Sequence, residues 1–408
     1  MSTVLVVSYH YPPEEGSCSE KNTRIVRKLN DSGFNVIVIT KGFGDTEIIE
    51  KHEKTIVVRT KNNGVFHKAK NTMCEASGAS SSGASMKGKV KRFVSDSLSP
   101  DSIIDWVPQV KKLYGENREL LSKADIILSI SSPYSAHLAS RFLADKLKIP
   151  YVMCYGDPWI YEPKRKRGKI RYAYEKRMER KLIDQAEKVL LITDWNKKKY
   201  QKLYSISPDK VYTYHIGYAE AECLSGIEPN HDGVLKIIYG GSLDKVHRNP
   251  QPFIEAMSHV DGVEAYIYNS DNEDVPKLIE EYNVQDKVIL LPIVGSKEFY
   301  RKLYEMDALL LFGNKTPFQV PGKVFTYIST RKGILYIKNN SASDDGTEEV
   351  LNAYGNAVTI RNTPDEIVSC LEKMKTNLET GVSSEAEQFE FHNTMQPIVE
   401  AIEDALKF

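Results

Sequence analysis

The stretch from Asp125 to Trp159 reads DIILSISSPYSAHLASRFLADKLKIPYVMCYGDPW, and it decides which fold we expect for the rest of the chain. An apolar run at 126–130 stops at Ser131-Ser132-Pro133, a helical pattern begins at Ser135, and a second apolar run at 151–155 stops at Gly156-Asp157-Pro158. A strand, a helix and a strand in this order form a parallel crossover unit, whose strands are buried on both faces. Parallel sheets bind ligands at the carboxyl ends of their strands, so the two polar loops are predicted to converge on one site.

The same alternation continues in both directions from this stretch. Apolar strands are expected at 4–8, 34–40, 55–60, 189–192 and 211–214, and again at 235–239, 263–268, 288–291, 308–312 and 334–337. A capping box at 363–366 predicts the start of a later helix. The prediction is an α/β chain of the GT-B type, with two doubly wound Rossmann-like domains facing a central cleft. The expected bounds are 1–219 for the first domain, 220–233 for a linker, 234–390 for the second domain and 391–408 for a helix that crosses back to the first.

Composition excludes several classes of protein. The 408 residues hold 55 Lys plus Arg and 55 Asp plus Glu, so no global field favours nucleic acid. The five cysteines show no metal-ligand spacing, which predicts reduced thiols with neither disulfides nor zinc. The first residues lack the basic and apolar regions of a signal peptide, and no apolar run is long enough to span a membrane. We therefore expect a cytoplasmic protein, either soluble or peripheral on the inner face of the cell membrane.

Two segments depart from the globular pattern. Between residues 77 and 88, eight of twelve residues are Ser or Gly, so 62–100 is predicted to be a flexible insertion. It is either a solvated loop or a loop that covers the acceptor or touches a membrane. The segment from Lys164 to Lys181 holds ten Lys or Arg, and a helix is expected from Gly168 with Ile170, Tyr174, Met178 and Leu182 as its apolar stripe. Its charge indicates either a solvated helix face or an anionic membrane surface as partner.

A glycine pair supplies the strongest candidate for phosphate binding. Gly240, Gly241 and Ser242 follow a predicted strand, and Arg248 precedes a predicted helix with Asn249 as its N-cap and Pro250 as its first helical residue. Glycines allow close approach of the backbone, a helix N-terminus favours an anion, and an arginine binds phosphate in bidentate fashion. A purely structural turn is the alternative, because no P-loop sequence is present.

Four stretches together resemble a known family. The loop from Tyr9 to Gly16, the sequence SSPYSAHL from Ser131, GDPW from Gly156 and VPGKVFTY from Val320 look like the retaining GT-B glycosyltransferases of family 4, closest to bacterial surface-polysaccharide members. The resemblance implies a nucleotide-sugar donor, UDP- or GDP-linked, bound mainly by the C-terminal domain. It also implies a glycan or lipid-linked acceptor bound mainly by the N-terminal domain, and neither a metal nor another cofactor.

The residues and the resemblance give three sets of candidates. Catalytic roles are assigned to Asp157, Arg248 and Lys323. Donor binding is assigned to Gly16, Ser17, Gly240, Gly241, Ser242, Arg248, Pro292, Lys323 and Thr326. Acceptor binding is assigned to His10, Glu14, Ser132, Tyr134 and Trp159.

Three positions depart from the family pattern. Gly156 replaces the usual Arg before Asp157, and Phe318 and Thr326 stand where a pair of glutamates is usual. Two other functions therefore stay open: a GT-B sugar-nucleotide 2-epimerase, and a catalytically inactive partner that binds a sugar nucleotide.

Overall fold

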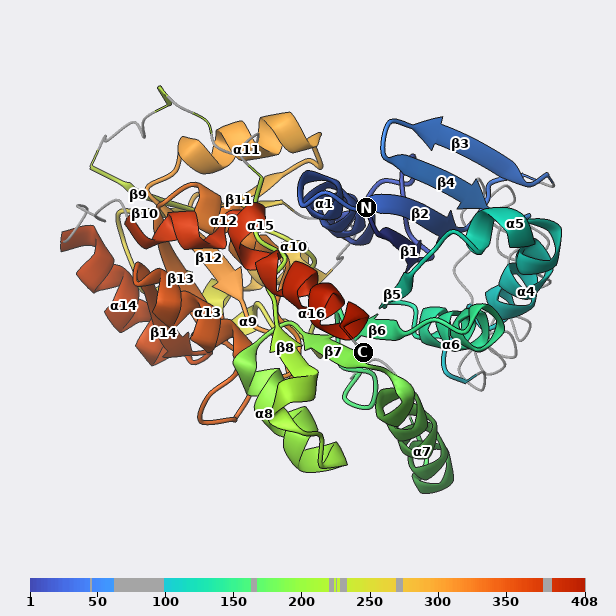
Figure 1. Ribbon diagram of the computed structural model, residues 1–408. Coiled ribbons are helices and arrows are strands. Elements are labelled where there is room, and N and C mark those ends of the chain that lie inside the picture. Colours follow the sequence, from blue (N-terminus) through green and yellow to red (C-terminus); the bar gives the residue numbers. More distant parts are fainter. Residues whose placement is uncertain are drawn as a thin grey trace, which may run out of the picture. The chain divides into compact units, whose positions relative to one another are not determined.

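The computed structural model divides into two compact units (Figure 1). Unit 1 holds residues 1–214 and 395–408, and unit 2 holds residues 215–394. The structure describes residues 1–44, 46–61, 99–162, 167–219, 224, 226–227, 233–268, 274–376 and 384–407. The predicted insertion at 62–100, except its last two residues, and most of the predicted linker at 220–233 lie outside these ranges.

Unit 1 is built on a sheet with the order β3-β4-β2-β1-β5-β6-β7-β8. All neighbouring pairs are parallel except β3 with β4. The order reverses at β1, so β1 and β5 flank the switch point where such sheets bind ligands. The strands are β1 (Thr3–Val7), β2 (Asn35–Thr40), β3 (Ile48–His52), β4 (Thr55–Arg59), β5 (Ile126–Ile130), β6 (Tyr151–Cys154), β7 (Lys188–Leu191) and β8 (Val211–Thr213).

The inner strands form because their side chains are apolar on both faces. β5, β6 and β7 are buried at every position, which is the reason that continuous apolar runs predicted them correctly. β3 has the sequence IIEKH, is mostly exposed and pairs antiparallel at the edge, so no apolar run marked it. The helices of unit 1 are α1 (Ser17–Asp31), α4 (Trp106–Glu116), α5 (Arg118–Leu121), α6 (Ser135–Leu147), α7 (Lys169–Gln185), α8 (Asp194–Tyr204) and α16 (Gln396–Leu406).

The last helix of the chain belongs to unit 1. α16 packs against β5, β6, β7 and β8 and reaches α1. Its inward residues include Ile398, Val399 and Ile402, and the Tyr212 hydroxyl of β8 donates a hydrogen bond to the Asp404 carboxylate. The chain therefore begins in unit 1, passes through unit 2 and returns.

Unit 2 has a six-stranded, wholly parallel sheet with the order β11-β10-β9-β12-β13-β14. Its switch point lies between β9 and β12. The elements are β9 (Leu235–Gly240), α9 (Gln251–Met257), β10 (Val263–Tyr268), α10 (Asp274–Glu281), β11 (Val288–Leu291), α11 (Ser296–Tyr304), β12 (Ala308–Phe312), α12 (Lys323–Ser329), β13 (Gly333–Lys338), α13 (Gly346–Tyr354), β14 (Ala357–Arg361), α14 (Pro364–Thr376) and α15 (Phe391–Thr394). The predicted α/β class with two doubly wound, Rossmann-like sheets is confirmed.

Two local predictions are only partly right. The helix predicted from the capping box at 363–366 is confirmed, because α14 begins at Pro364. The box itself does not close, since the Glu366 carboxylate accepts from the backbone N–H and the side chain of Arg361.

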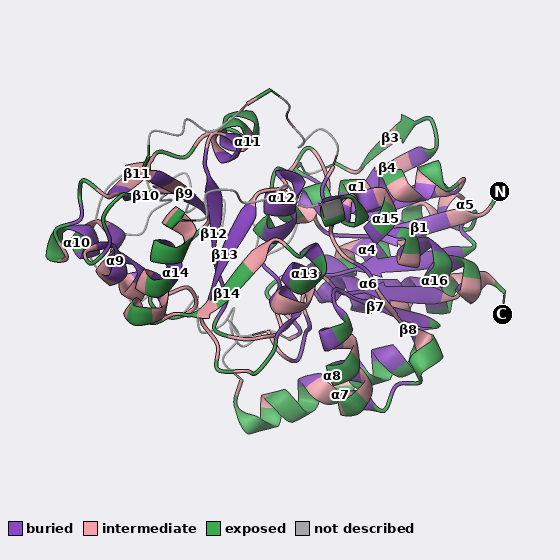
Figure 2. Cartoon of the chain, turned by 90° about the vertical axis from the view of Figure 1, so that its left-hand side faces the viewer, coloured by how far each residue is buried: buried purple, intermediate pink, exposed green. Residues whose placement is uncertain are grey.

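The apolar stripe predicted for α7 is right only toward the end of the helix: Leu182 is buried and Met178 packs partly against the core, but Ile170 is 89% exposed and Tyr174 is 57% exposed. The other buried positions of α7 are Glu175, Glu179 and Ile183. Exposed residues predominate along the rest of the helix (Figure 2).

Candidate functional site

The loop after β1 carries the first group of candidate residues in unit 1. The His10 imidazole Nδ1 lies 2.8 Å from one Glu14 oxygen, and the Lys41 ammonium donates to the other at 2.5 Å. Burial alone would raise the pKa of Glu14, but the hydrogen bonds from Lys41 and His10 outweigh this effect and hold the pKa below its usual value. Burial also lowers the pKa of His10, against the opposing effect of Glu14. The group is therefore a carboxylate held between a neutral imidazole and an ammonium.

The start of α1 lies at the end of the same loop. Gly16 precedes the helix with a φ of 119°, a conformation that favours glycine, and Ser17 is its exposed first residue. Asn22, one turn further on, is buried and donates to the Ser8 hydroxyl at 2.6 Å and to the His10 carbonyl at 2.7 Å. The helix thereby fixes the loop that carries His10 and Glu14.

The loops after β5 and β6 hold the remaining candidates of unit 1. β1, β5 and β6 are consecutive in the sheet: Ser132 and Tyr134 follow β5, next to β1, and Asp157 and Trp159 follow β6, one strand further on. Ser132 and Asp157 are half-buried. Tyr134 and Trp159 are buried and stack at a ring distance of 5.4 Å, and the indole donates to Glu175 at 3.2 Å. These two aromatic rings support the loops and present no face to solvent.

The sequence interpretation missed two basic residues at this edge. Lys41 directly follows β2, so its place at the carboxyl end of a buried strand was the available signal. Lys21 is only 4% exposed and donates to the Ser131 carbonyl at 3.0 Å. It precedes Ile25 and Leu29 at intervals of four residues, and a lysine on the buried stripe of a helix was the signal there.

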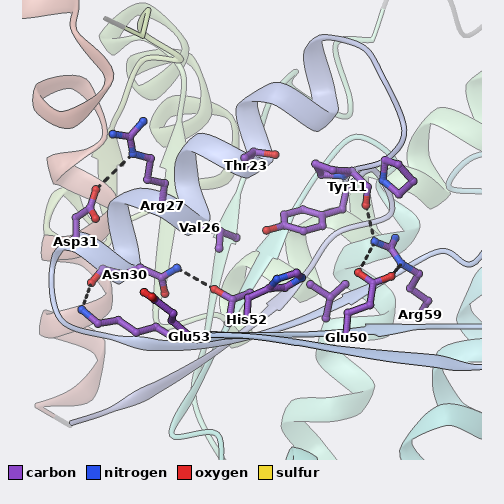
Figure 3. Close-up of a pocket in the computed structure, with 15 residues that line it drawn as sticks. Tyr11, Thr23, Val26, Arg27, Asn30, Asp31, Glu50, His52, Glu53 and Arg59 are labelled. Carbon is purple, nitrogen blue, oxygen red and sulfur yellow. Dashed lines mark hydrogen bonds and ion pairs between the residues drawn. The ribbon is translucent and has the colours of Figure 1, made fainter. Parts of the chain in front are cut away.

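A recess of about 660 Å³ opens beside this loop, between α1 and the β3–β4 hairpin (Figure 3). We call it the α1 recess. Its wall includes Tyr11, Thr23, Val26, Asn30 and His52. Acidic and basic groups balance in it, with Asp31, Glu50 and Glu53 against Arg27, Lys54 and Arg59.

The buried Arg59 guanidinium joins the α1 recess to the loop after β1. It donates to the Pro12 carbonyl at 2.5 Å and to both oxygens of Glu50, at 2.8 and 3.1 Å. Burial raises the pKa of Tyr11 to about 12, so its hydroxyl stays protonated at neutral pH. A neutral, hydroxyl-rich molecule fits such a charge-balanced wall better than an anion does.

The candidate residues of unit 2 gather around β9 and α12. The Gly240 N–H donates to the Tyr327 hydroxyl at 2.8 Å, and a Cβ at Gly240 would lie 2.3 Å from the Phe299 ring. Packing within the unit therefore requires this glycine, and its N–H is already bonded. Lys323, the first residue of α12, places its ammonium 4.0 Å from the centre of the same Phe299 ring. Thr326 lies one turn further along α12 and is half-buried.

Arg248 is held in place by neutral partners. Its Nε donates to the Asn314 amide oxygen at 2.9 Å, and one terminal nitrogen lies 3.4 Å from the Ser242 carbonyl. No carboxylate of the described residues forms an ion pair with Arg248. Asn314 follows β12, so the arginine is anchored across the switch point between β9 and β12. This oriented, uncompensated charge is suited to an anion.

Pro292 lies apart from this group. It follows β11, two strands from β9 in the sheet order, and is exposed. It lines a separate pocket of about 330 Å³ with Tyr268 and Glu298. Within the described residues, no group of three His, Cys, Asp or Glu is placed to hold a metal ion, and no helix has the length and apolar character needed to cross a membrane.

Comparisons with known proteins add the following. No protein-family model and no curated protein sequence matches this chain. Among solved structures, it is similar to sucrose-phosphate synthase from Thermosynechococcus elongatus, with a TM-score of 0.68, 9% identity and coverage of 99% of this chain and 100% of that one. It is also similar to Anabaena HepE in complex with UDP (TM-score 0.65, 11% identity, 99% and 100% covered) and to WaaG, a glycosyltransferase involved in lipopolysaccharide biosynthesis (0.59, 14%, 98% and 98%).

These likenesses define the fold. The two Rossmann-like units, in their order along the chain, form a GT-B fold. Its solved structural neighbours include several glycosyltransferases, one of them from Rickettsia africae.

Proposed function

We propose that this protein transfers a sugar from a nucleotide-sugar donor to a glycan or lipid-linked acceptor, with retention, in the synthesis of a surface polysaccharide or glycoconjugate. The observation that carries the proposal is Arg248, which is oriented by Asn314 and Ser242 and has no carboxylate partner among the described residues. Preorganised cations stabilise the charge that grows on a departing diphosphate. Lys323, at the first position of α12, adds a second cation on the same unit.

The donor is UDP- or GDP-linked, and no other cofactor takes part. UDP is the first probe, because HepE has been crystallised with UDP and with UDP-glucose. Arg248 and Lys323 meet the diphosphate charge directly in this proposal, so transfer needs no metal. Gly241, Ser242 and Thr326 lie beside these cations in the chain and contact the remainder of the donor.

The acceptor belongs to unit 1. Asp157 accepts the hydrogen bond of the attacking hydroxyl and orients it, which is a role that a carboxylate at a strand end can perform. His10, Glu14 and Ser132 contact the sugar that carries this hydroxyl. The α1 recess holds neutral sugar residues further from the reaction, since its charges are balanced and its volume is that of a ligand pocket.

If the acceptor is lipid-linked, the protein must bind the surface of an anionic membrane, and α7 offers a face for this contact. One face of α7 carries Ile170, Tyr174, Arg177 and Lys181 at helical spacing, and all four are exposed. Apolar, aromatic and basic side chains on one face suit the surface of an anionic bilayer. Arg167 and Arg171 of the predicted basic segment do not contribute, because both bind the buried Glu175.

Thermal unfolding with a panel of nucleotides tests the proposal. A ligand at 100 times its dissociation constant adds about 2.7 kcal/mol to the free energy of unfolding. We expect UDP or GDP, and one of their sugar derivatives, to raise the melting temperature, and the sugar nucleotide to be consumed when acceptor is present. If no nucleotide diphosphate raises the melting temperature, the proposal is wrong. Binding without turnover identifies an inactive partner, and conversion of the sugar without acceptor identifies an epimerase.

A further inference from the structure

Lys21 is a buried cation with an unusual environment. It lies on α1, is 4% exposed, and donates to the Ser131 carbonyl at 3.0 Å. No carboxylate in the described part of the chain lies within ion-pair distance of its ammonium. Removing an ammonium from water without a counter-charge is costly, so an apolar residue at this position would give a more stable fold. Residues kept at such a cost are commonly kept for function.

The ammonium occupies the space of a missing side chain. A Cβ built on Gly156 would lie 2.8 Å from the Lys21 Nζ and 3.0 Å from the Ser131 carbonyl oxygen. The same carbonyl accepts the Gly156 N–H at 3.2 Å. Lys21 and Gly156 therefore share one acceptor, and the glycine leaves the room that the lysine fills.

Three loops meet at this lysine. It starts from the helix that follows the β1 loop, binds Ser131 directly after β5, and lies against the residue before Asp157. Its charge also reaches His137, which is fully buried with its Nδ1 2.7 Å from the Ser129 hydroxyl. Burial first, and Lys21 second, lower the pKa of His137 to about 3, so this histidine stays neutral beside the cation.

We infer that Lys21 is a positioning residue for transfer: it supplies, from α1, the positive charge beside the Asp157 loop that a basic side chain at position 156 would otherwise supply. The inference rests on the proposed function for the activity that it modulates. A cation and a shared carbonyl fix the residue before Asp157, and this keeps the Asp157 carboxylate in its orientation. Lys21 touches neither substrate in this assignment.

Lys21→Met separates this role from a purely structural one. The methionine fills the same volume without the charge, so we expect the melting temperature to stay level or rise while the transfer rate falls about tenfold or more. Affinity for UDP or GDP should not change, since the nucleotide belongs to unit 2. Lys28→Met, near the other end of α1, is the matched control and should change neither quantity.

A swap of the charge between the two positions completes the test. Gly156→Arg alone should abolish transfer, because its side chain collides with Lys21. In the Lys21→Ala background, Gly156→Arg should instead recover part of the lost rate, since the new guanidinium enters the vacated space from the other loop. A melting temperature and a rate that fall together in Lys21→Met, or a double variant no faster than Lys21→Ala, would overturn the inference. If the wild-type protein transfers no sugar, the proposed function fails, and the positioning role fails with it. A more stable Lys21→Met would then still show that the buried ammonium costs stability.

Discussion

The two units differ in how the charges around their candidate ligand sites are balanced. In unit 1 the acidic side chains have basic partners from the same unit: Glu14 lies between Lys41 and His10, and the α1 recess has as many acidic as basic residues. In unit 2 the Arg248 guanidinium has only neutral partners among the described residues. Two sheets of the same architecture thus offer a neutral surface and a positive one. The difference favours a hydroxyl-rich acceptor on unit 1 and a diphosphate on unit 2.

The sharpest way to break this comparison is Asp157→Asn. The variant keeps the shape of the side chain and removes its charge, so affinity for nucleotide should stay constant while the transfer rate falls by about 10²- to 10⁴-fold. Calorimetric titration of the nucleotide and the transfer rate give the two quantities. Asp145→Asn, on α6 and paired with Arg141, is the control and should be neutral in both. An equal loss of nucleotide affinity in Asp157→Asn would show that the assignment of ligands to units is wrong.

Glu179 differs from the other acidic residues discussed in unit 1, because its hydrogen-bond donors are tyrosine hydroxyls. Its fully buried carboxylate accepts from the Tyr200 hydroxyl at 2.8 Å and from the Tyr204 hydroxyl at 2.5 Å. Burial raises its pKa to about 7 against these hydrogen bonds. Because the pKa is higher in the folded chain, the stabilising effect of this group is complete below pH 4.5 and is lost as the pH rises toward 7.

Glu179→Gln should remove that pH dependence. A shift from 4.5 to about 7 corresponds to about 3 kcal/mol, so the variant should gain up to this amount over wild type at pH 8. Denaturant unfolding at pH 5 and pH 8 measures the gain. Glu175→Gln, one turn earlier and equally buried, should lose stability instead, because it leaves Arg167 and Arg171 without their carboxylate. A similar loss in both variants would contradict the raised pKa.

Arg248→Ala examines the positive side of the comparison. A charge-assisted hydrogen bond contributes about 1.5–3 kcal/mol, so affinity for the nucleotide diphosphate should fall about 10- to 150-fold. Lys323→Ala should weaken it similarly if its ammonium turns from Phe299 to the phosphates. Arg361→Ala serves as the control, since this arginine is exposed on β14 of the same unit and pairs with Glu366. Unchanged affinity in Arg248→Ala would remove the observation on which the proposed function depends.

Sequence reasoning succeeded where a single physical signal dominates. Parallel strands must be apolar on both faces, so β5, β6 and β12 could be placed from composition alone. It failed on β3, whose exposed edge residues carry no such signal. It also failed on part of α7, because a buried glutamate carries no apolar signal: Glu175 is paired with two nearby arginines and with Trp159, and Glu179 with Tyr200 and Tyr204 from α8.

The candidate site residues were predictable for the same reason, and only where a local signal marks them. Strand ends predicted which loops would meet, and the structure places the proposed residues of unit 1 at neighbouring strands and most of those of unit 2 around β9 and α12. What a local pattern cannot give is a contact between segments that are distant in sequence. Lys21 against Gly156, and Arg248 against Asn314, are contacts of that kind.

The exposed face of α7 extends the comparison to a third surface, one that is positive and apolar together. Each basic residue near an anionic bilayer contributes about 1 kcal/mol, so the double variant Arg177→Ser, Lys181→Ser should bind anionic vesicles about 30-fold more weakly. Flotation with vesicles rich in anionic lipid, compared with neutral vesicles, measures the difference in binding. Arg118→Ser combined with Lys123→Ser removes two charges of unit 1 outside α7 and is the control. Binding that ignores anionic lipid content would leave α7 as a solvated helix.

The α1 recess gives the smallest expected effect and sharpens the neutral side of the comparison. Thr23→Trp places an indole over the recess from α1, where Thr23 is exposed beside Tyr11 and Val26 (Figure 3). If distant sugar residues bind there, KM for a long glycan acceptor should rise about tenfold, which is 1.4 kcal/mol, while kcat and nucleotide affinity stay constant. A single-sugar acceptor should be unaffected, because it does not reach the recess. Lys28→Trp adds the same bulk to α1 outside the recess, and an equal rise of KM in that control would show that the recess does not select the acceptor.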